Sequence, residues 1–334
     1  GDLHADTFHA VTKAFLTLNA VTAAQEVTDR PSLIIVRTHI APGSPNKQGL
    51  VFGVVFIVAG LGFKLGAVPF HMWTPDAYEG APTVVTAFMS TGVKAAAFAA
   101  FVRVFLKGLD PMIADWAPII WWIAALTMIV GTVVGVAQTS LKRMLAYSTI
   151  SHVGFILLGI FALNLQGLQG GVFYMVAHGL VIGGLFFVTG MLEERRGTRR
   201  IEEFGGLQQT VPRMAAVMLV ITLGSVALPG LVGFVGEFLT LLGAFLANRV
   251  YAVLAVGGVI LGAVYLLWAY QRMWHGPLER DENRAIGDLT GREWAILAPL
   301  VAAIIVLGLF PRPVLERVEP SAQRVVEQTQ APSP

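Results

Sequence analysis

Residues 49–71 read GLVFGVVFIVAGLGFKLGAVPFH, an apolar run long enough to span a membrane, and a lysine, Lys64, lies well inside it. A second lysine, Lys94, lies in the next apolar run, among Thr, Gly, Val and Ala. Placing a charged side chain near the centre of a bilayer costs about 2.5–3.5 kcal/mol on insertion scales. Two such lysines indicate that the amines are used, and carrying protons is the simplest use.

The composition predicts a membrane protein. Hydrophobic residues make up 55% of the 334 residues and charged residues only 13%, whereas soluble domains are roughly 25% charged. We therefore expect an all-α, polytopic membrane helix bundle of about eight spans. The net charge of +2 gives no argument for a nucleic-acid partner. Because the chain has no cysteine, we expect no disulfide, no thiolate metal site and no redox cofactor.

Two of the expected helices carry a break. The apolar pattern predicts helices at about 49–71, 82–107, 116–139, 143–164, 168–192, 211–247, 250–274 and 293–311. Pro69 falls in the first of these and Pro229 in the sixth, so each should free the carbonyl four residues earlier. Broken helices at membrane depth favour hydrated cavities, although a plain kink satisfied by neighbouring helices is the alternative.

Basic residues are distributed unevenly between the loops. If the spans alternate, one side receives Lys142, Arg143, Arg195, Arg196, Arg199, Arg200, Arg213, Arg272, Arg280, Arg284 and Arg292. The opposite side holds little beyond Lys107 and Arg249 before the C-terminal tail. The positive-inside rule makes the first side cytoplasmic, which also places residues 72–81 in the cytoplasm. We expect a multi-pass protein of a bacterial inner membrane.

Five ionisable residues fall inside predicted spans, one in each of five helices: Lys64, Lys94, His152, His178 and Glu237. Amines, imidazoles and carboxylates can exchange protons near neutral pH when they are buried, so a hydrated file of them could move protons sideways through the membrane. Other interpretations stay open for single members. A histidine can be a packing residue, a lysine can snorkel to the interface, and Glu237 can pair with a lysine only to hold helices together.

Residues 1–48 differ from the rest of the chain. They combine a charged, helical-looking start with a short β-like run at 33–36 and a turn-rich stretch at 41–47. No signal peptide is recognisable. We expect a short non-membrane segment at 1–48, a transmembrane domain at 49–318 and a polar tail at 319–334.

Longer motifs point to a family. KLGAVPFHMWTPDAYEGAPT at 64–83, followed by Lys94, resembles the antiporter-like membrane subunits of respiratory complex I, in particular the N-type subunit. YSTISHVG at 147–154, MVAHG at 175–179 and LPGLVGFVGEF at 228–238 resemble the M-type subunit instead. The resemblance covers 49–318, N-type at about 49–140 and M-type at about 147–318.

The resemblance implies a fold and a function. The family has fourteen helices in two inverted five-helix repeats, and its members translocate protons within NADH:quinone oxidoreductase while quinone reduction occurs in partner subunits. Lys64 matches the family's lysine before Pro-Phe-His, and Lys94 matches the next lysine. His152 and His178 match the M-type histidines, and Glu237 matches the terminal glutamate. The expected partners are other membrane subunits of complex I, the lipid bilayer and protons, with no cofactor in this chain.

The sequence departs from the family in two ways. No glutamate occurs in an apolar span before Lys64, so the family's partner for that lysine is missing. Residues 23–48 resemble a stretch of transketolase, too short to bind thiamine diphosphate. We therefore expect a mosaic chain, with a switch from N-type to M-type between about 110 and 147. The alternatives are a subunit of a multisubunit sodium/proton antiporter or of a membrane-bound hydrogenase, and a non-functional truncated or mosaic fragment.

Overall fold

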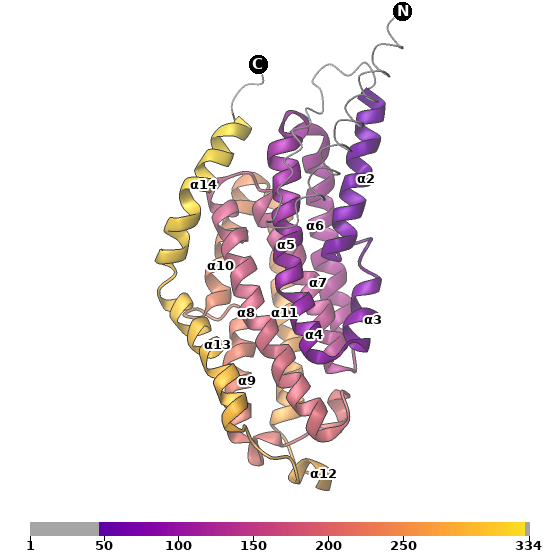
Figure 1. The fold of residues 1–334 in the computed structure, drawn as a ribbon, viewed down its shortest axis with the longest axis vertical. Coiled ribbons are helices and arrows are strands. Elements are labelled where there is room, and N and C mark those ends of the chain that lie inside the picture. Colours follow the sequence, from indigo (N-terminus) through magenta and orange to yellow (C-terminus); the bar gives the residue numbers. More distant parts are fainter. Residues whose placement is uncertain (1–46, 331–334) are drawn as a thin grey trace, which may run out of the picture. The chain divides into compact units, whose positions relative to one another are not determined.

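The structure, a computed structural model, describes residues 47–330. The expected foreign segment 1–48, with its transketolase-like stretch 23–48, lies outside this range except for its last two residues. All regular elements of the described part are helices, which confirms the predicted all-α bundle (Figure 1). Six of these helices, counted within 47–330, are long and apolar enough to cross a membrane.

The described elements follow the apolar pattern closely. The six candidate spans are α4–α5 with the π-turn after them (Thr83–Gly108), α6 (Ile113–Val136), α7 (Leu141–Ile160), α8 (Leu165–Arg196), α11 (Arg249–Trp274) and α13 (Gly291–Leu309). The other helices are α2 (Lys47–Leu65), α3 (Trp73–Gly80), α9 (Pro212–Ser225), α10 (Val232–Ala247), α12 (Asp281–Arg284) and α14 (Arg312–Gln330).

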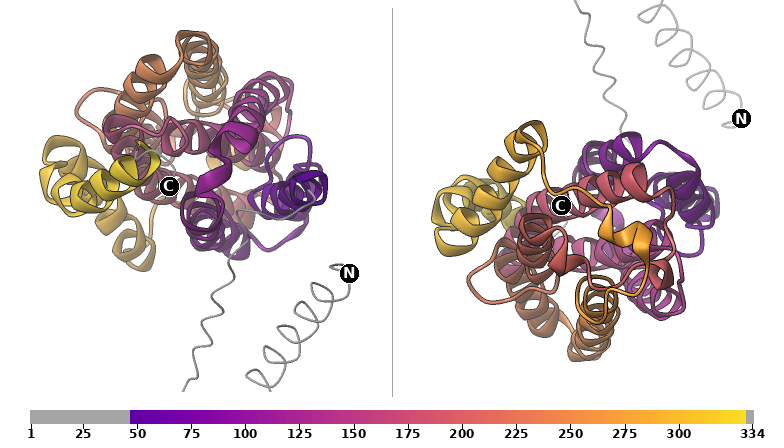
Figure 2. Two further views of the ribbon diagram at one scale, coloured as in Figure 1. Left: turned by 90° about the horizontal axis from the view of Figure 1, so that it is seen from above. Right: turned by 90° about the horizontal axis from the view of Figure 1, so that it is seen from below.

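The central element is α8, the longest helix at 32 residues. It contacts α4, α7, α9 and α10, and the views along the bundle show the helices packed side by side (Figure 2). Glycines allow a close approach to α10: a Cβ added at Gly170 would lie 2.5 Å from the Thr240 nitrogen, and one at Gly243 would lie 2.4 Å from the Gly167 nitrogen. Since helices in lipid associate through tight packing of small residues, this contact fixes α10 against α8.

The pair α6 and α7 uses the same principle. A Cβ added at Gly131 would lie 2.5 Å from the Ser151 nitrogen, and one at Gly154 would lie 2.7 Å from the Ala124 carbonyl oxygen. Backbone therefore meets backbone at both positions. Since α7 also packs against α8, the two pairs form one continuous frame.

The predicted break near Pro229 is confirmed. Helix α9 ends at Ser225 and α10 begins at Val232, while Ala227 and Gly230 adopt positive φ angles of 54° and 94°. The two halves lie against each other, since a Cβ added at Gly233 would lie 2.0 Å from the Gly224 carbonyl oxygen. Only glycine allows that contact.

The first break lies elsewhere than predicted. Helix α2 ends at Leu65, so the prediction of a helix continuing to His71 is wrong, and Pro69 lies in the turn that follows. The Leu65 carbonyl is still free of a helical partner, because it belongs to the last turn of α2. The expected helix 82–107 is also interrupted at Thr91, between α4 (Thr83–Ser90) and α5 (Gly92–Arg103).

The polar C-terminal stretch is helical up to Gln330, which the sequence analysis did not predict. Helix α14 carries alternating charges, among them Arg312 and Glu316 at 2.6 Å, and it packs against α8. Most residues of this segment are polar, and only a narrow stripe of apolar residues is partly buried. A hydropathy pattern therefore does not reveal the helix.

Loops rich in arginine gather at one end of the described unit (Figure 1). Ser140 and Arg200 form an isolated β-bridge, and Arg195 Nη2 lies 2.7 Å from Glu293 Oε2. The Arg213 backbone N–H donates to Asp288 Oδ2 at 3.0 Å. We call this part of the unit the basic end, and its assignment to the cytoplasm stays a prediction.

Substituting Gly170 by Ala should destabilise the protein by about 1–3 kcal/mol, because the new Cβ meets the α10 backbone. The measurement is the melting temperature of purified protein in detergent. Gly257→Ala is the matched control, since Gly257 lies in α11 with nothing within 4 Å of an added Cβ. Equal melting temperatures for the two variants would contradict this account of the α8–α10 contact.

Candidate functional site

The five predicted residues divide by exposure. Lys94, His178 and Glu237 are buried, at 3%, 5% and 5% exposure, and His152 is partly buried. Lys64 is exposed on the last turn of α2. The structure therefore brings four of the five into the interior of the bundle and leaves the fifth on its surface.

The amine of Lys94 is enclosed by residues 65–78. Lys94 Nζ donates a hydrogen bond to the Leu65 carbonyl, the group released by the end of α2. It also lies 5.5 Å from the centroid of the Trp73 ring and 5.8 Å from that of Tyr78. A buried ammonium needs such compensation, and a desolvated cation–π contact can contribute about 2 kcal/mol.

Gly66 makes this enclosure possible. Its φ of +71° is a left-handed conformation that favours glycine. A Cβ at Gly66 would lie 3.0 Å from Lys94 Nζ and 2.5 Å from Thr74 Oγ1. The lysine and the threonine therefore occupy the space that a side chain at position 66 would need.

Two further hydrogen bonds hold the turn after α2. Trp73 Nε1 donates to the Phe63 carbonyl at 2.9 Å, which returns the chain onto the end of α2. The Val68 backbone N–H donates to Thr127 Oγ1 on α6 at 3.0 Å. The acceptor for Lys94 is thus fixed to two helices.

Lys94 and His178 lie on neighbouring elements. Thr91, one turn before Lys94, approaches α8 at two of its glycines. A Cβ added at Gly183 would lie 3.5 Å from Thr91 Cγ2. A Cβ at Gly179, the residue after His178, would lie 4.0 Å from Thr91 Cβ. The break at Thr91 therefore occurs where the chain meets the histidine-bearing part of α8.

The two histidines form a pair with a tyrosine. The ring centroids of His152 and His178 are 4.9 Å apart, and His152 Nδ1 lies 2.7 Å from Tyr174 Oη. A cavity of ≈10 Å³ is lined by both histidines, Tyr174 and Ser225. Its volume suits about one water molecule.

A second cavity of ≈10 Å³ connects the histidines to the glutamate. His152 and Ser225 line it as they line the first, and its other polar lining residues are Ser151, Glu237 and Tyr265. Ser225 is the last residue of α9, so the helix break lies beside both cavities. His152 and Ser225 therefore border two spaces of about one water each, one beside His178 and the other beside Glu237.

Lys64 is not part of this group. It is exposed on α2, as are Phe52, Phe56 and Phe63 of the same helix. With the residues of the described range it forms no ion pair. Its predicted role in proton movement stays a prediction.

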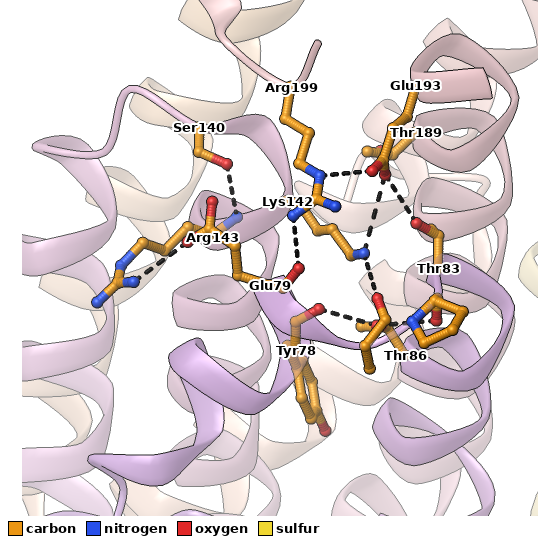
Figure 3. A network of polar contacts seen from close by, with 12 residues as sticks. Tyr78, Glu79, Thr83, Thr86, Ser140, Lys142, Arg143, Thr189, Glu193 and Arg199 are labelled. Atoms are coloured by element: carbon orange, nitrogen blue, oxygen red, sulfur yellow. Dashed lines mark hydrogen bonds and ion pairs between the residues drawn. The ribbon is translucent and has the colours of Figure 1, made fainter. Parts of the chain in front are cut away.

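A network of charged residues holds α3 at the basic end (Figure 3). Lys142, whose side chain is fully buried, donates to the Ala81 carbonyl at 2.6 Å and lies 3.8 Å from Glu193 Oε2. Arg199 donates to the Glu79 carbonyl and to Glu193 Oε1, both at 2.5 Å. Cations thus satisfy the last carbonyls of α3, where the helix dipole is negative.

The comparisons with known proteins bear on this arrangement. A family described as NADH:quinone oxidoreductase/Mrp antiporter, TM, matches residues 22–262.

The chain belongs to this antiporter family.

It is 38% identical over 290 residues to NADH-quinone oxidoreductase subunit M of Mycobacterium tuberculosis, covering 86% of this chain and 52% of that protein. It is 39% identical over 282 residues to subunit N of Alkalilimnicola ehrlichii, covering 84% of this chain and 57% of that protein. Among solved structures, respiratory complex I from Thermus thermophilus with bound NADH contains a chain with 33% identity and a TM-score of 0.75, covering 84% of this chain and 60% of that one.

The chain spans just over half the length of these curated relatives. Similarity to both an M and an N subunit accords with the mixed resemblance of the motifs. The family match includes all of 23–48, and the mosaic origin of that stretch stays a prediction.

Several residues of the site were missed from the sequence. Thr74 and Tyr78 lie in the family motif, but only its lysine was predicted to act. Ser225 was expected only as the carbonyl freed by Pro229, and Tyr265 was not predicted. Tyr174, one turn before His178 on α8, was not among the predicted site residues. Among the described residues, no group of three His, Asp or Glu side chains is placed to hold a metal ion.

Substituting Lys142 by Met should destabilise the protein by about 1–3 kcal/mol, because the buried Ala81 carbonyl loses its donor. Thermal unfolding in detergent measures the change. Arg200→Gln is the control: Arg200 pairs with Glu202 while 58% exposed, and such surface pairs contribute about 0–1 kcal/mol. An equal effect of both substitutions would show that the buried contact does not stabilise α3.

Proposed function

We propose that this chain is a proton-translocating membrane subunit of an NADH:quinone oxidoreductase, with no redox centre of its own. The observation that carries the proposal is the connected set of buried ionisable side chains in a bundle of this family. A bare structural role does not account for a lysine, two histidines and a glutamate placed along neighbouring helices, because each is costly to bury in a membrane.

The order of the groups follows from their contacts. Lys94 lies on α5 one turn after Thr91, which approaches α8 at Gly179 beside His178, and His178 faces His152 at 4.9 Å between ring centroids. From His152 the second cavity leads to Glu237. Protons would pass from Lys94 to His178 and His152, and from there through water beside Ser225 to Glu237, the terminal donor.

The surroundings of the subunit are proposed on the same basis. The M and N relatives are named as subunits of NADH-quinone oxidoreductase, so other membrane subunits are the expected partners of this chain. Lys64, which is exposed on α2, would exchange protons with Lys94 when a partner subunit covers that face. The basic end would face the cytoplasm of a bacterial cell, by the positive-inside rule.

A sodium/proton antiporter subunit is the second candidate, because the family description includes the Mrp antiporter. Membrane-bound hydrogenases and a non-functional fragment remain alternatives from the sequence. Transport that requires sodium would favour the antiporter, and NADH-driven proton uptake without sodium would favour the oxidoreductase.

Lys94→Met should abolish NADH-driven proton uptake while the complex still assembles, because the side chain keeps its length and loses its exchangeable protons. The measurement is acidification of proteoliposomes that contain the assembled complex. Lys107→Met, which replaces an exposed lysine, is the matched control and should pump normally. Normal pumping by the Lys94 variant would remove the main proposal.

Gly262→Val should slow proton uptake about tenfold by filling the cavity between His152 and Glu237, which Gly262 lines. No atom lies within 4 Å of a Cβ added at Gly262, so the fold should tolerate the change. Gly257→Val on the same helix is the control, since that glycine also has open space but lines neither cavity. Equal uptake rates in the two variants would argue against a path through this cavity.

A further inference from the structure

Two hydroxyl groups beside Lys94 lack hydrogen-bond partners within the described residues. Thr74 and Tyr78 are both 0% exposed, and neither Thr74 Oγ1 nor Tyr78 Oη meets an acceptor or donor there. Leaving a buried hydroxyl unsatisfied costs about 1–3 kcal/mol. Protein interiors usually meet this cost with an ordered water molecule.

Both hydroxyl-bearing residues border the lysine amine. A Cβ added at Gly66 would lie 2.5 Å from Thr74 Oγ1 and 3.0 Å from Lys94 Nζ, so both atoms border the same small space. Lys94 Nζ is 5.8 Å from the Tyr78 ring centroid, and the Tyr78 ring extends away from the charged network of the basic end (Figure 3). The amine has more N–H groups than the single carbonyl of Leu65 can accept, so it has donors left for water.

We propose that the Thr74 and Tyr78 hydroxyls hold water against the Lys94 amine and relay protons to it from the α3 side of the bundle. The inference rests on the proposed function and assigns two positioning residues to its first step.

The relay leaves no charge on either hydroxyl. A proton bound to the neighbouring water moves to the hydroxyl oxygen while that hydroxyl gives its own hydrogen to the amine nitrogen, directly or through a second water. At the hydroxyl one O–H bond breaks as another forms. The water gives up its extra proton, and the amine, neutral beforehand, forms a new N–H bond and becomes an ammonium. Burial raises the pKa of Tyr78, so its hydroxyl stays neutral and can both donate and accept.

Helix α3, which carries both residues, runs from beside the amine to the basic end. It is roughly 12 Å long, with its first turn beside Lys94 and its last carbonyls held by Lys142 and Arg199. Glu193, which both cations contact, is 23% exposed. The α3 segment therefore reaches from a partly exposed carboxylate to the buried amine.

The test compares Thr74→Val, which keeps the shape and removes the hydroxyl, with Thr74→Ser, which restores it. In the assembled complex, proton uptake should fall about tenfold or more in Thr74→Val and in Tyr78→Phe, and Thr74→Ser should recover most of the rate. Tyr251→Phe, a buried tyrosine packed against Trp121 and Trp122, should retain the wild-type rate. A structural role for Thr74 would not be rescued by serine, which lacks the methyl group.

Radiolytic hydroxyl-radical labelling followed by mass spectrometry provides a second readout, because it modifies buried side chains that contact bound water. Tyr78 should be labelled in the wild-type complex and less so in Thr74→Val. Normal uptake in Thr74→Val and Tyr78→Phe would overturn the inference, as would an unlabelled Tyr78. If Lys94→Met also pumps normally, the proposed function fails together with the relay. If Lys94→Met loses pumping while Thr74→Val and Tyr78→Phe pump normally, only the relay is refuted.

Discussion

The hydrogen bond from the Lys94 amine to the Leu65 carbonyl determines the form of the chain around it. Leu65 is the last residue of α2, so no helical N–H competes for its carbonyl and the amine can bind it. The amine then occupies the space next to Gly66, which requires a residue without a side chain and a left-handed backbone. The turn that follows brings Trp73 and Tyr78 around the same amine. One buried charge thus explains the end of a helix, a glycine and the placement of two aromatic rings.

The bundle that surrounds this charge is held by contacts between backbones. Helix α10 packs on glycines of α8, and the α4–α5 segment packs on other glycines of α8. Helices α6 and α7 also contact each other through glycines. In lipid this packing replaces the hydrophobic effect that joins helices in water. Because the helices approach each other closely, the two cavities beside the histidines and Glu237 are each about the size of one water molecule. The glycines at the helix contacts therefore account both for the close packing and for the small size of these cavities.

The sequence was a sufficient guide where the physics is local. Long apolar runs predicted the spans, Pro229-Gly230 predicted the break between α9 and α10, and ionisable residues in apolar runs identified Lys94, His178 and Glu237, which are buried as expected. Features that depend on how helices face each other were not predictable. The break at Thr91 and the contacts of Tyr174 and Ser225 depend on how neighbouring helices pack. Lys64 looked as central as Lys94, because the sequence of one apolar run does not show which face of the helix other helices cover. Helix α14 was missed because its stripe is too narrow for a hydropathy signal.

The burial of Lys142 has a consequence for how the protein responds to salt. Mobile ions weaken an interaction only where they can approach it, and the Debye length is about 8 Å at physiological ionic strength. The contact from Lys142 to the Ala81 carbonyl lies beneath Glu193 and Arg199, with none of the lysine side chain exposed, whereas Arg200 and Glu202 meet at the surface. Rising ionic strength would therefore loosen the outer ion pairs of the basic end first, while α3 keeps its position beside the buried amine.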